Sequence, residues 1–149
     1  MVATPVSLGQ IWCDQTYYLN AETGKPQSKY VIALAITQER DVLHAVFTSQ
    51  PNGLKAKPAC STGLPRAGHY VGYVNNLFTK ETWVDFSSIR TLDNLDLGRH
   101  LSSGKKIALP AKLEDRLFCA ILRCATQLED ITHREKNWIY QSISTCNCK

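Results

Sequence analysis

The sequence lacks any long hydrophobic run. No stretch approaches the roughly 20 apolar residues that a membrane-spanning helix needs, so we expect no membrane partner. The first ten residues also lack a basic segment followed by an apolar run, the pattern of a secretory signal peptide. Internal repeats and low-complexity segments are absent as well. These absences predict a soluble, cytoplasmic protein.

The six cysteines lack the paired C-x-x-C spacing of structural zinc sites. The terminal Cys146-Asn147-Cys148 segment has only one residue between its thiols. The sequence therefore predicts no metal site, and it indicates no cofactor. Because no export signal is evident, we expect free thiols at Cys13, Cys60, Cys119 and Cys124.

The length and the charge set broad limits on the fold and the partner. A chain of 149 residues suits one domain with a sizeable core. Lysine and arginine exceed aspartate and glutamate enough to give a formal charge of +4. This mildly basic balance permits a polyanionic partner without requiring one.

The longest apolar and β-branched stretch runs from residue 29 to residue 50 and is broken by one polar turn at 37–41. This pattern predicts an antiparallel hairpin whose strands are covered on both faces. Antiparallel strands return to where they began, so Lys29 should lie close to Thr48, Ser49 and Gln50. A cation beside hydroxyl groups at a strand end is a place where a phosphate can bind.

The rest of the chain predicts short strands, two long polar loops and one clear helix. In the helical segment, apolar residues recur every three or four positions after Pro110, as in an amphipathic helix. The tail after residue 131 is either another helical turn laid on the sheet or a dimer contact. In chain order, the expected elements are a strand at 9–13, a mobile loop at 14–28, the hairpin, a loop at 51–68, strands at 69–74 and 82–86, a short turn or helix from 89 to about 98, and a helix within 111–128.

The order of these segments resembles the MazF/PemK/Kid toxin family. The matching stretches are Gly9-Gln10-Ile11-Trp12, Val31-Ile32-Ala33-Leu34, Val46-Phe47-Thr48-Ser49-Gln50 and Ile89-Arg90-Thr91-Leu92-Asp93, followed by Leu97, Gly104 and the closing helix. The resemblance covers a domain at residues 9–130 and leaves a tail at 1–8 and a C-terminal extension at 131–149. Each motif is weak alone, so their order and spacing carry the resemblance.

The resemblance implies a mainly β fold: a small SH3-like barrel of about five to seven strands with a C-terminal α-helix, related to that of CcdB. It also implies a homodimer that cleaves single-stranded RNA without a metal and is restrained by a cognate antitoxin protein. In that chemistry the RNA 2′-OH attacks the neighbouring phosphate. The protein takes one proton, gives another and stabilises charge on the phosphate oxygens.

The resemblance also indicates roles for residues of this chain. Lys29 and Thr48 would hold the phosphate; without the resemblance they are a surface lysine and a hydroxyl at a strand end. The candidates for proton transfer are Asp85, which is otherwise a polar strand residue, and Glu22 of the first loop, which is otherwise a solvated glutamate. Lys29-Tyr30 replaces the Arg-Pro pair that is common in the family. A lysine keeps the positive charge but loses the planar fork that grips a phosphate at two points.

Further residues are candidates for RNA binding through charge, polar contacts or base stacking. Arg90 either contacts RNA or stabilises its turn by pairing with Asp93 or Asp85. Tyr17 either stacks on a base, covers the core or meets a partner, and the scattered basic residues either line a groove or form an ordinary solvated surface. The candidates are Ser49, Gln50, Arg90, Lys55, Lys57, Arg66 and Tyr17.

A second interpretation keeps the same barrel but removes catalysis. Such a protein would inhibit a protein target, as CcdB does, or would bind nucleic acid or a regulator without cutting. Loss of the family arginine favours this alternative, and the basic loops favour the nuclease.

Overall fold

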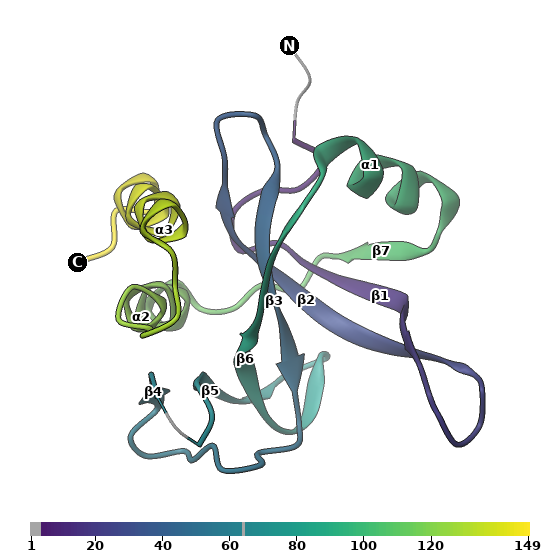
Figure 1. Ribbon diagram of the computed structural model, residues 1–149, viewed down its shortest axis with the longest axis horizontal. Helices are drawn as coiled ribbons and strands as arrows, with labels where there is room; N and C mark the ends of the chain where they lie inside the picture. The colour runs from purple at the N-terminus through teal and green to yellow at the C-terminus, as the bar shows by residue number, and fades with distance from the viewer. Residues whose placement is uncertain (1–3, 64) are drawn as a thin grey trace.

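The computed structural model describes residues 4–63 and 65–149 of the 149-residue chain. These ranges are mainly β, as predicted, with seven strands and three helices (Figure 1). No helix within them is long and apolar enough to cross a membrane. In chain order the elements are β1 (Ile11–Leu19), β2 (Pro26–Ile36), β3 (Val42–Thr48), β4 (Cys60–Ser61), β5 (Gly68–Val74), β6 (Phe78–Leu92), α1 (Asn94–Ser103), β7 (Lys106–Leu109), α2 (Asp115–Ala125) and α3 (His133–Thr145).

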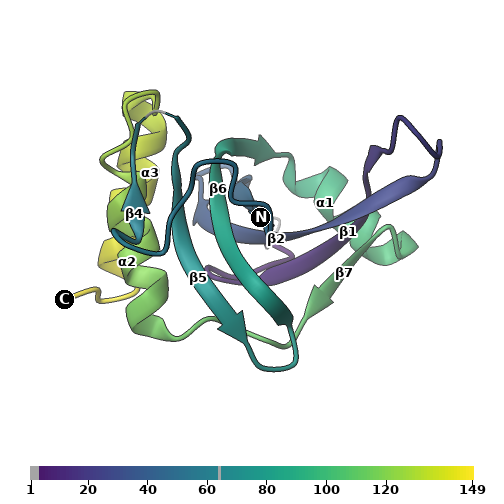
Figure 2. The same cartoon turned by 90° about the horizontal axis from the view of Figure 1, so that it is seen from below.

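All seven strands of the described residues belong to one sheet, in the order β4-β5-β6-β3-β2-β1-β7, and each pair of neighbours is antiparallel. The predicted central hairpin is confirmed as β2 and β3. Its turn is closed by the Thr37 amide, which donates to the Asp41 carbonyl at 2.9 Å. Every residue of β3 is buried because helices cover both sides of the sheet. The pair α2 and α3 lies on one side and α1 on the other (Figures 1 and 2).

Two hydrophobic cores lie on the two faces of the sheet. Val31 and Ile32 are adjacent on β2 and therefore point to opposite faces. Ile32 packs in the larger core with residues of α2 and α3, including Ile139, whereas Val31 packs in the smaller core with Trp12 and with Leu97 of α1. Full burial of one such side chain contributes about 1.5–3 kcal/mol to folding. The C-terminal helix α3 thus supplies part of the main core through Ile139.

The expected mobile loop at 14–28 is wrong. β1 continues through Leu19, β2 begins at Pro26, and only a short turn joins them. Within this turn the Asn20 side chain accepts hydrogen bonds from the amides of Glu22 and Thr23. The hairpin projects away from the body of the molecule (Figures 1 and 2). Its outer half has no core face to fill, so its composition is polar although its backbone is extended.

The chain between residues 89 and 104 agrees with the expectation in part. Ile89–Leu92 is the end of the long strand β6, and the expected turn or helix is a helix, α1, which continues past Gly98 to Ser103. The Asp93 side chain caps α1 by accepting from the amides of Leu95 and Asp96. The predicted amphipathic helix is confirmed as α2, although it begins five residues after Pro110.

The expectation of free thiols is wrong for three of the four cysteines named. Cys60 is bonded to Cys124, which joins β4 to α2, and Cys119 is bonded to Cys148, which joins α2 to the C-terminal end. Cys13 is free, as expected, and so is Cys146. The expectation rested on the missing export signal, which carries no information about which thiols meet in space.

Candidate functional site

A hollow of about 340 Å³ lies where β2, β3 and β6 meet the turn that precedes β6. It brings the predicted residue Lys29 together with Thr48 and Ser49, which follow it nearly twenty residues later in the chain. The residues that line it include two lysines, five serine and threonine residues and two aromatic residues besides Phe47, but no carboxylate. We call this site the lysine hollow; it is lined by Ser28, Lys29, Tyr30, Phe47, Thr48, Ser49, Leu77, Phe78, Thr79, Lys80 and Thr82.

The strand register explains the meeting of Lys29 and Thr48. Val31 of β2 is paired with Val46 of β3, so two residues further along each strand Lys29 and Thr48 come to the same end of the hairpin. Across the other edge of β2, Lys29 is paired with Asp14 of β1. The Asp14 carboxylate lies 3.4 Å from Lys106 Nζ of β7. The strand partner of Lys29 is therefore a buried aspartate that forms an ion pair with Lys106.

The Thr48 hydroxyl shapes the turn after β3. It accepts a hydrogen bond from the Gln50 amide at 3.1 Å and donates to the Gln50 carbonyl at 3.4 Å. The side chain is buried, whereas Ser49 is exposed. Thr48 therefore fixes the backbone at the rim of the hollow, and a phosphate that used its hydroxyl as a donor would replace the longer of these two bonds.

A second pair of predicted residues, Arg66 and Asp85, forms an ion pair beside the hollow. Arg66 Nη2 lies 2.6 Å from Asp85 Oδ2, and Arg66 Nη1 donates to the carbonyls of Gln50 at 3.0 Å and Pro51 at 3.3 Å. The other Asp85 oxygen accepts from the amide and the hydroxyl of Ser87. Contacts thus run continuously from Thr48 through Gln50 and Arg66 to Asp85.

The surroundings of Asp85 favour its charged form. Burial alone would raise its pKa, but the hydrogen bonds from Ser87 and Arg66, together with the guanidinium charge, outweigh burial and hold the pKa below the ordinary value. Asp85 is consequently a carboxylate at neutral pH, with both oxygens engaged.

Three other predicted residues lie away from the hollow. Glu22 is in the turn of the projecting β1–β2 hairpin (Figures 1 and 2). Tyr17 contacts Tyr18 edge to face and packs against the smaller core. Arg90 is exposed on β6, opposite His44 of β3. Within residues 4–63 and 65–149 Arg90 forms no ion pair, because Asp85 pairs with Arg66 and Asp93 caps α1.

The two predicted lysines of the second loop differ in how closely they approach the site. The carbonyl of Lys55 accepts a hydrogen bond of 3.1 Å from Trp83 Nε1, and Trp83 is the strand partner of Thr48. Both Lys55 and Lys57 are exposed. This places the backbone of Lys55 near the rim, while its side chain is open to solvent.

Phe78, Thr79 and Lys80 also line the hollow but are not among the predicted site residues. The sequence predicts a strand only from residue 82, whereas β6 already begins at Phe78. Among residues 78–82 only Phe78 is apolar, so no alternation of apolar and polar residues indicates a strand there. A strand there would have placed Lys80 near the end of β3, because β6 and β3 are neighbours.

A buried polar group lies further along the same sheet. His44 is buried and its ring contacts Trp12 edge to face, with 5.9 Å between ring centroids. His44 Nδ1 and Trp12 Nε1 are both buried without a hydrogen-bond partner in the described residues. Burial, followed by the charges of Lys106 and Arg90, lowers the pKa of His44 to about 4. His44 is therefore neutral at physiological pH.

The described ranges contain no cluster of three or more histidine, cysteine, aspartate or glutamate residues that could hold a metal ion. A scan against protein-family models and searches of curated proteins and of solved structures found no match.

Proposed function

We propose that this protein is the toxin of a toxin–antitoxin system and cleaves single-stranded RNA without a metal ion. The observation that carries the proposal is the meeting of Lys29 and Lys80 with six hydroxyl-bearing residues in a hollow lined by no carboxylate. Positive charge beside hydroxyl donors attracts and orients a phosphodiester. The exposed ring of Tyr30, which contacts the buried ring of Phe78 edge to face at 5.5 Å, offers an apolar surface for a flanking base.

The proposed reaction needs no group beyond the RNA and the protein. The 2′-OH attacks the adjacent phosphorus, and the bond from phosphorus to the 5′-oxygen breaks, which leaves a 2′,3′-cyclic phosphate and a 5′-OH. The proton leaves the 2′-oxygen and a proton reaches the 5′-oxygen. Lys29 and Lys80 stabilise the charge on the phosphate oxygens. Asp85, on β6 three residues after Thr82 of the hollow, would act in proton transfer.

The finer features of the proposal follow the same resemblance. An SH3-like barrel would require the sheet to close on itself through contacts beyond the strand pairings of the order β4-β5-β6-β3-β2-β1-β7. A homodimer would extend the hollow into a longer RNA-binding surface, and a cognate antitoxin protein would cover it.

A specific observation also favours the second candidate, a non-catalytic binding protein on the same fold. Both Asp85 oxygens are engaged by Arg66 and Ser87, and Glu22 lies in a distant turn. Neither carboxylate lines the hollow. A protein that binds RNA at Lys29 without a free proton acceptor would hold the strand and leave it intact.

The experiment is an incubation of the purified protein with a long single-stranded RNA and excess chelator, followed by mapping of the 5′ ends. We expect discrete cuts in the wild type that are lost in Lys29→Ala and in Thr48→Ala. Lys112→Ala and Thr145→Ala are matched controls, since both residues are exposed and lie outside the hollow. Circular dichroism checks that Thr48→Ala folds, and Thr48→Ser should retain cutting.

The outcomes separate the two candidates. Binding of the RNA by the folded wild type without any cuts would refute the nuclease and support the binding protein. Cuts that persist in Lys29→Ala would refute the site. Absence of both binding and cutting would refute the nuclease and the RNA-binding form of the second candidate, and would favour its other form, the inhibitor of a protein target.

A further inference from the structure

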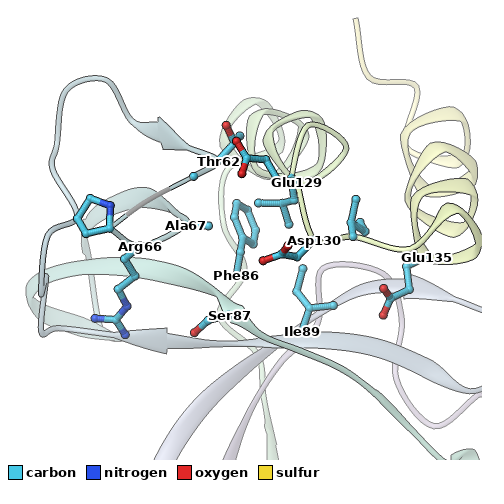
Figure 3. A pocket seen from close by; sticks show the side chains of 13 residues that line it. Thr62, Arg66, Ala67, Phe86, Ser87, Ile89, Glu129, Asp130 and Glu135 are labelled. Carbon is cyan, nitrogen blue, oxygen red and sulfur yellow. The ribbon is translucent and has the colours of Figure 1, made fainter.

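A groove of about 540 Å³ lies between the sheet and the helical layer. One wall is the segment around β4 that leads into β5, the floor is β6, and the other wall is the loop between α2 and α3 with the start of α3 (Figure 3). We call it the acidic groove; it is lined by Thr62, Gly63, Pro65, Arg66, Ala67, Phe86, Ser87, Ile89, Leu128, Glu129, Asp130, Ile131 and Glu135.

The rim of the groove carries excess negative charge. Glu129 and Asp130 are exposed, and within residues 4–63 and 65–149 neither forms an ion pair. Glu135 adds a third carboxylate, one oxygen of which accepts from the amide and the hydroxyl of Thr132. The only cation in the lining is Arg66, which already pairs with Asp85. Three carboxylates thus face the groove in a chain whose formal charge is +4.

The floor of the groove is apolar. Phe86 is buried in the main core, and Ile89, Leu128 and Ile131 are partly buried hydrophobic residues packed against it. Figure 3 shows Glu129 above the Phe86 ring, Asp130 beside that ring and next to Ile89, Glu135 beyond Ile89, and Arg66 at the opposite end. An occupant therefore meets apolar side chains and carboxylates side by side.

The two walls are joined covalently. The Cys60–Cys124 disulfide ties β4, just before Thr62, to α2, just before the loop that carries Glu129. The wall at β4 is further fixed by the Ser61 hydroxyl, which donates to the Arg66 carbonyl at 2.8 Å. The opposite wall is fixed by the capping box of α3, in which Thr132 and Glu135 bond to each other. A groove held open in this way loses little conformational entropy on binding.

We propose that the acidic groove binds a segment of a partner protein that places an arginine or lysine between apolar side chains. The carboxylates complement the cation, and the floor accepts its neighbours. Nucleic acid is disfavoured because its phosphates would face three carboxylates. The proposal goes beyond RNA cleavage and does not depend on it, since the lysine hollow shares none of its lining residues with the groove.

The test uses three acetylated and amidated peptides, Leu-Arg-Leu, Leu-norleucine-Leu and Leu-Glu-Leu, titrated into the isotope-labelled, oxidised full chain. Amide chemical shifts report which residues respond. We expect Leu-Arg-Leu to shift the amides of Phe86, Ile89 and Asp130, the norleucine peptide to bind more weakly and Leu-Glu-Leu to leave them unchanged. The double variant Glu129→Gln/Asp130→Asn should weaken Leu-Arg-Leu about tenfold, which corresponds to about 1.4 kcal/mol.

The control variant Glu22→Gln/Glu114→Gln changes the net charge equally, but both residues are exposed and lie outside the groove. It should keep the affinity of the wild type for Leu-Arg-Leu. No shift with Leu-Arg-Leu, equal binding of Leu-Arg-Leu and Leu-Glu-Leu, or an equal loss in both double variants would each overturn the proposal. A single-stranded RNA oligonucleotide that shifts the groove amides would also overturn it, in favour of nucleic acid.

Discussion

The lysine hollow and the acidic groove lie along the same strand and have opposite charge. Thr82 of β6 lines the hollow, whereas Phe86 and Ile89 of β6 lie in the floor of the groove. Asp85 stands between the two regions and pairs with Arg66. One strand thus passes from a cationic site to an anionic one, and the ion pair marks the boundary.

The two regions differ in how they are built. The hollow is formed by neighbouring strands whose register fixes which residues meet. The groove is formed between the sheet and helices that follow much later in the chain, and a disulfide with a sequence separation of 64 joins its walls. The hollow should therefore survive changes that loosen the helical layer, whereas the groove should not. Four predictions test this difference, from the largest expected effect to the smallest.

The largest effect is expected when the disulfide of the groove is removed. In Cys60→Ser/Cys124→Ser, the loss of a cross-link across about 64 residues should lower the free energy of unfolding by about 4 kcal/mol. Urea unfolding under non-reducing conditions measures this change. Leu-Arg-Leu binding should weaken, while binding of single-stranded RNA should persist under conditions where the variant is folded. Cys13→Ser is the control because Cys13 is free; an equal loss of RNA binding would contradict the separation of the two regions.

The second prediction concerns the ion pair at the boundary. Asp85→Asn leaves the largely buried guanidinium of Arg66 without its counter-charge, which should destabilise the fold by about 3 kcal/mol. Because the pKa of Asp85 is lowered on folding, its contribution is present above the unfolded pKa and is lost as pH falls through the folded pKa. Urea unfolding between pH 2 and pH 7 should therefore show a smaller acid loss in Asp85→Asn than in the wild type.

A double-mutant cycle with Arg66→Gln isolates the interaction between the two side chains. A coupling energy near zero would contradict the assignment of the pair as the boundary. If Arg66→Gln loses binding of Leu-Arg-Leu but keeps binding of RNA, Arg66 contributes to the acidic groove and not to the lysine hollow.

The third prediction concerns His44, a buried residue of the sheet that carries both regions, and the effect of its titration on the free energy of unfolding. His44 has a folded pKa of about 4, below its ordinary value, so the unfolded chain binds its proton first as pH falls. Stability from this group is complete above about pH 6.5 and declines toward pH 4, with a loss of about 2 kcal/mol at pH 5.

Replacement of His44 by phenylalanine removes that titration and keeps an aromatic ring against Trp12. Urea unfolding at pH 7 and pH 5 should show about 2 kcal/mol less acid destabilisation in His44→Phe than in the wild type. An equal acid loss in the two proteins would contradict the buried, neutral state of His44. His44→Gln serves as a second, polar variant if phenylalanine disturbs the packing.

The sequence predicted the parts of the fold in which local patterns have a direct structural meaning. The apolar runs at β2 and β3 indicated the central hairpin because both faces of these strands are covered. The outer half of β1 was not predicted because its residues, among them Tyr18 and Leu19, face solvent and show no alternation of apolar and polar side chains. For α1 the sequence predicts a short turn or helix that ends near Gly98, because a glycine often follows the last residue of a helix, whereas the helix continues to Ser103.

The candidate site shows the same division. The proximity of Lys29 and Thr48 could be predicted from the sequence because the two ends of an antiparallel hairpin lie side by side. The partnership of Arg66 with Asp85 could not, because a long loop positions Arg66 and loops obey no simple register. The acidic groove likewise depends on where α2 and α3 pack, and its disulfide joins cysteines whose spacing matches no motif.

The smallest effect is expected when one lysine is removed from the hollow. Lys29→Ala should weaken binding of a short single-stranded RNA about tenfold and should reduce the slope of log affinity against log salt by about 0.7, because one phosphate contact is lost. Fluorescence anisotropy at several salt concentrations measures both quantities. Lys80→Ala should behave alike, since it lines the same hollow, while Lys112→Ala should keep the slope of the wild type. Neutralising Glu129 and Asp130 should change RNA affinity little at 0.15 M salt, where charges are screened beyond about 8 Å. An RNA affinity that responds to the groove carboxylates as strongly as to Lys29 would mean that the two regions act as one electrostatic surface.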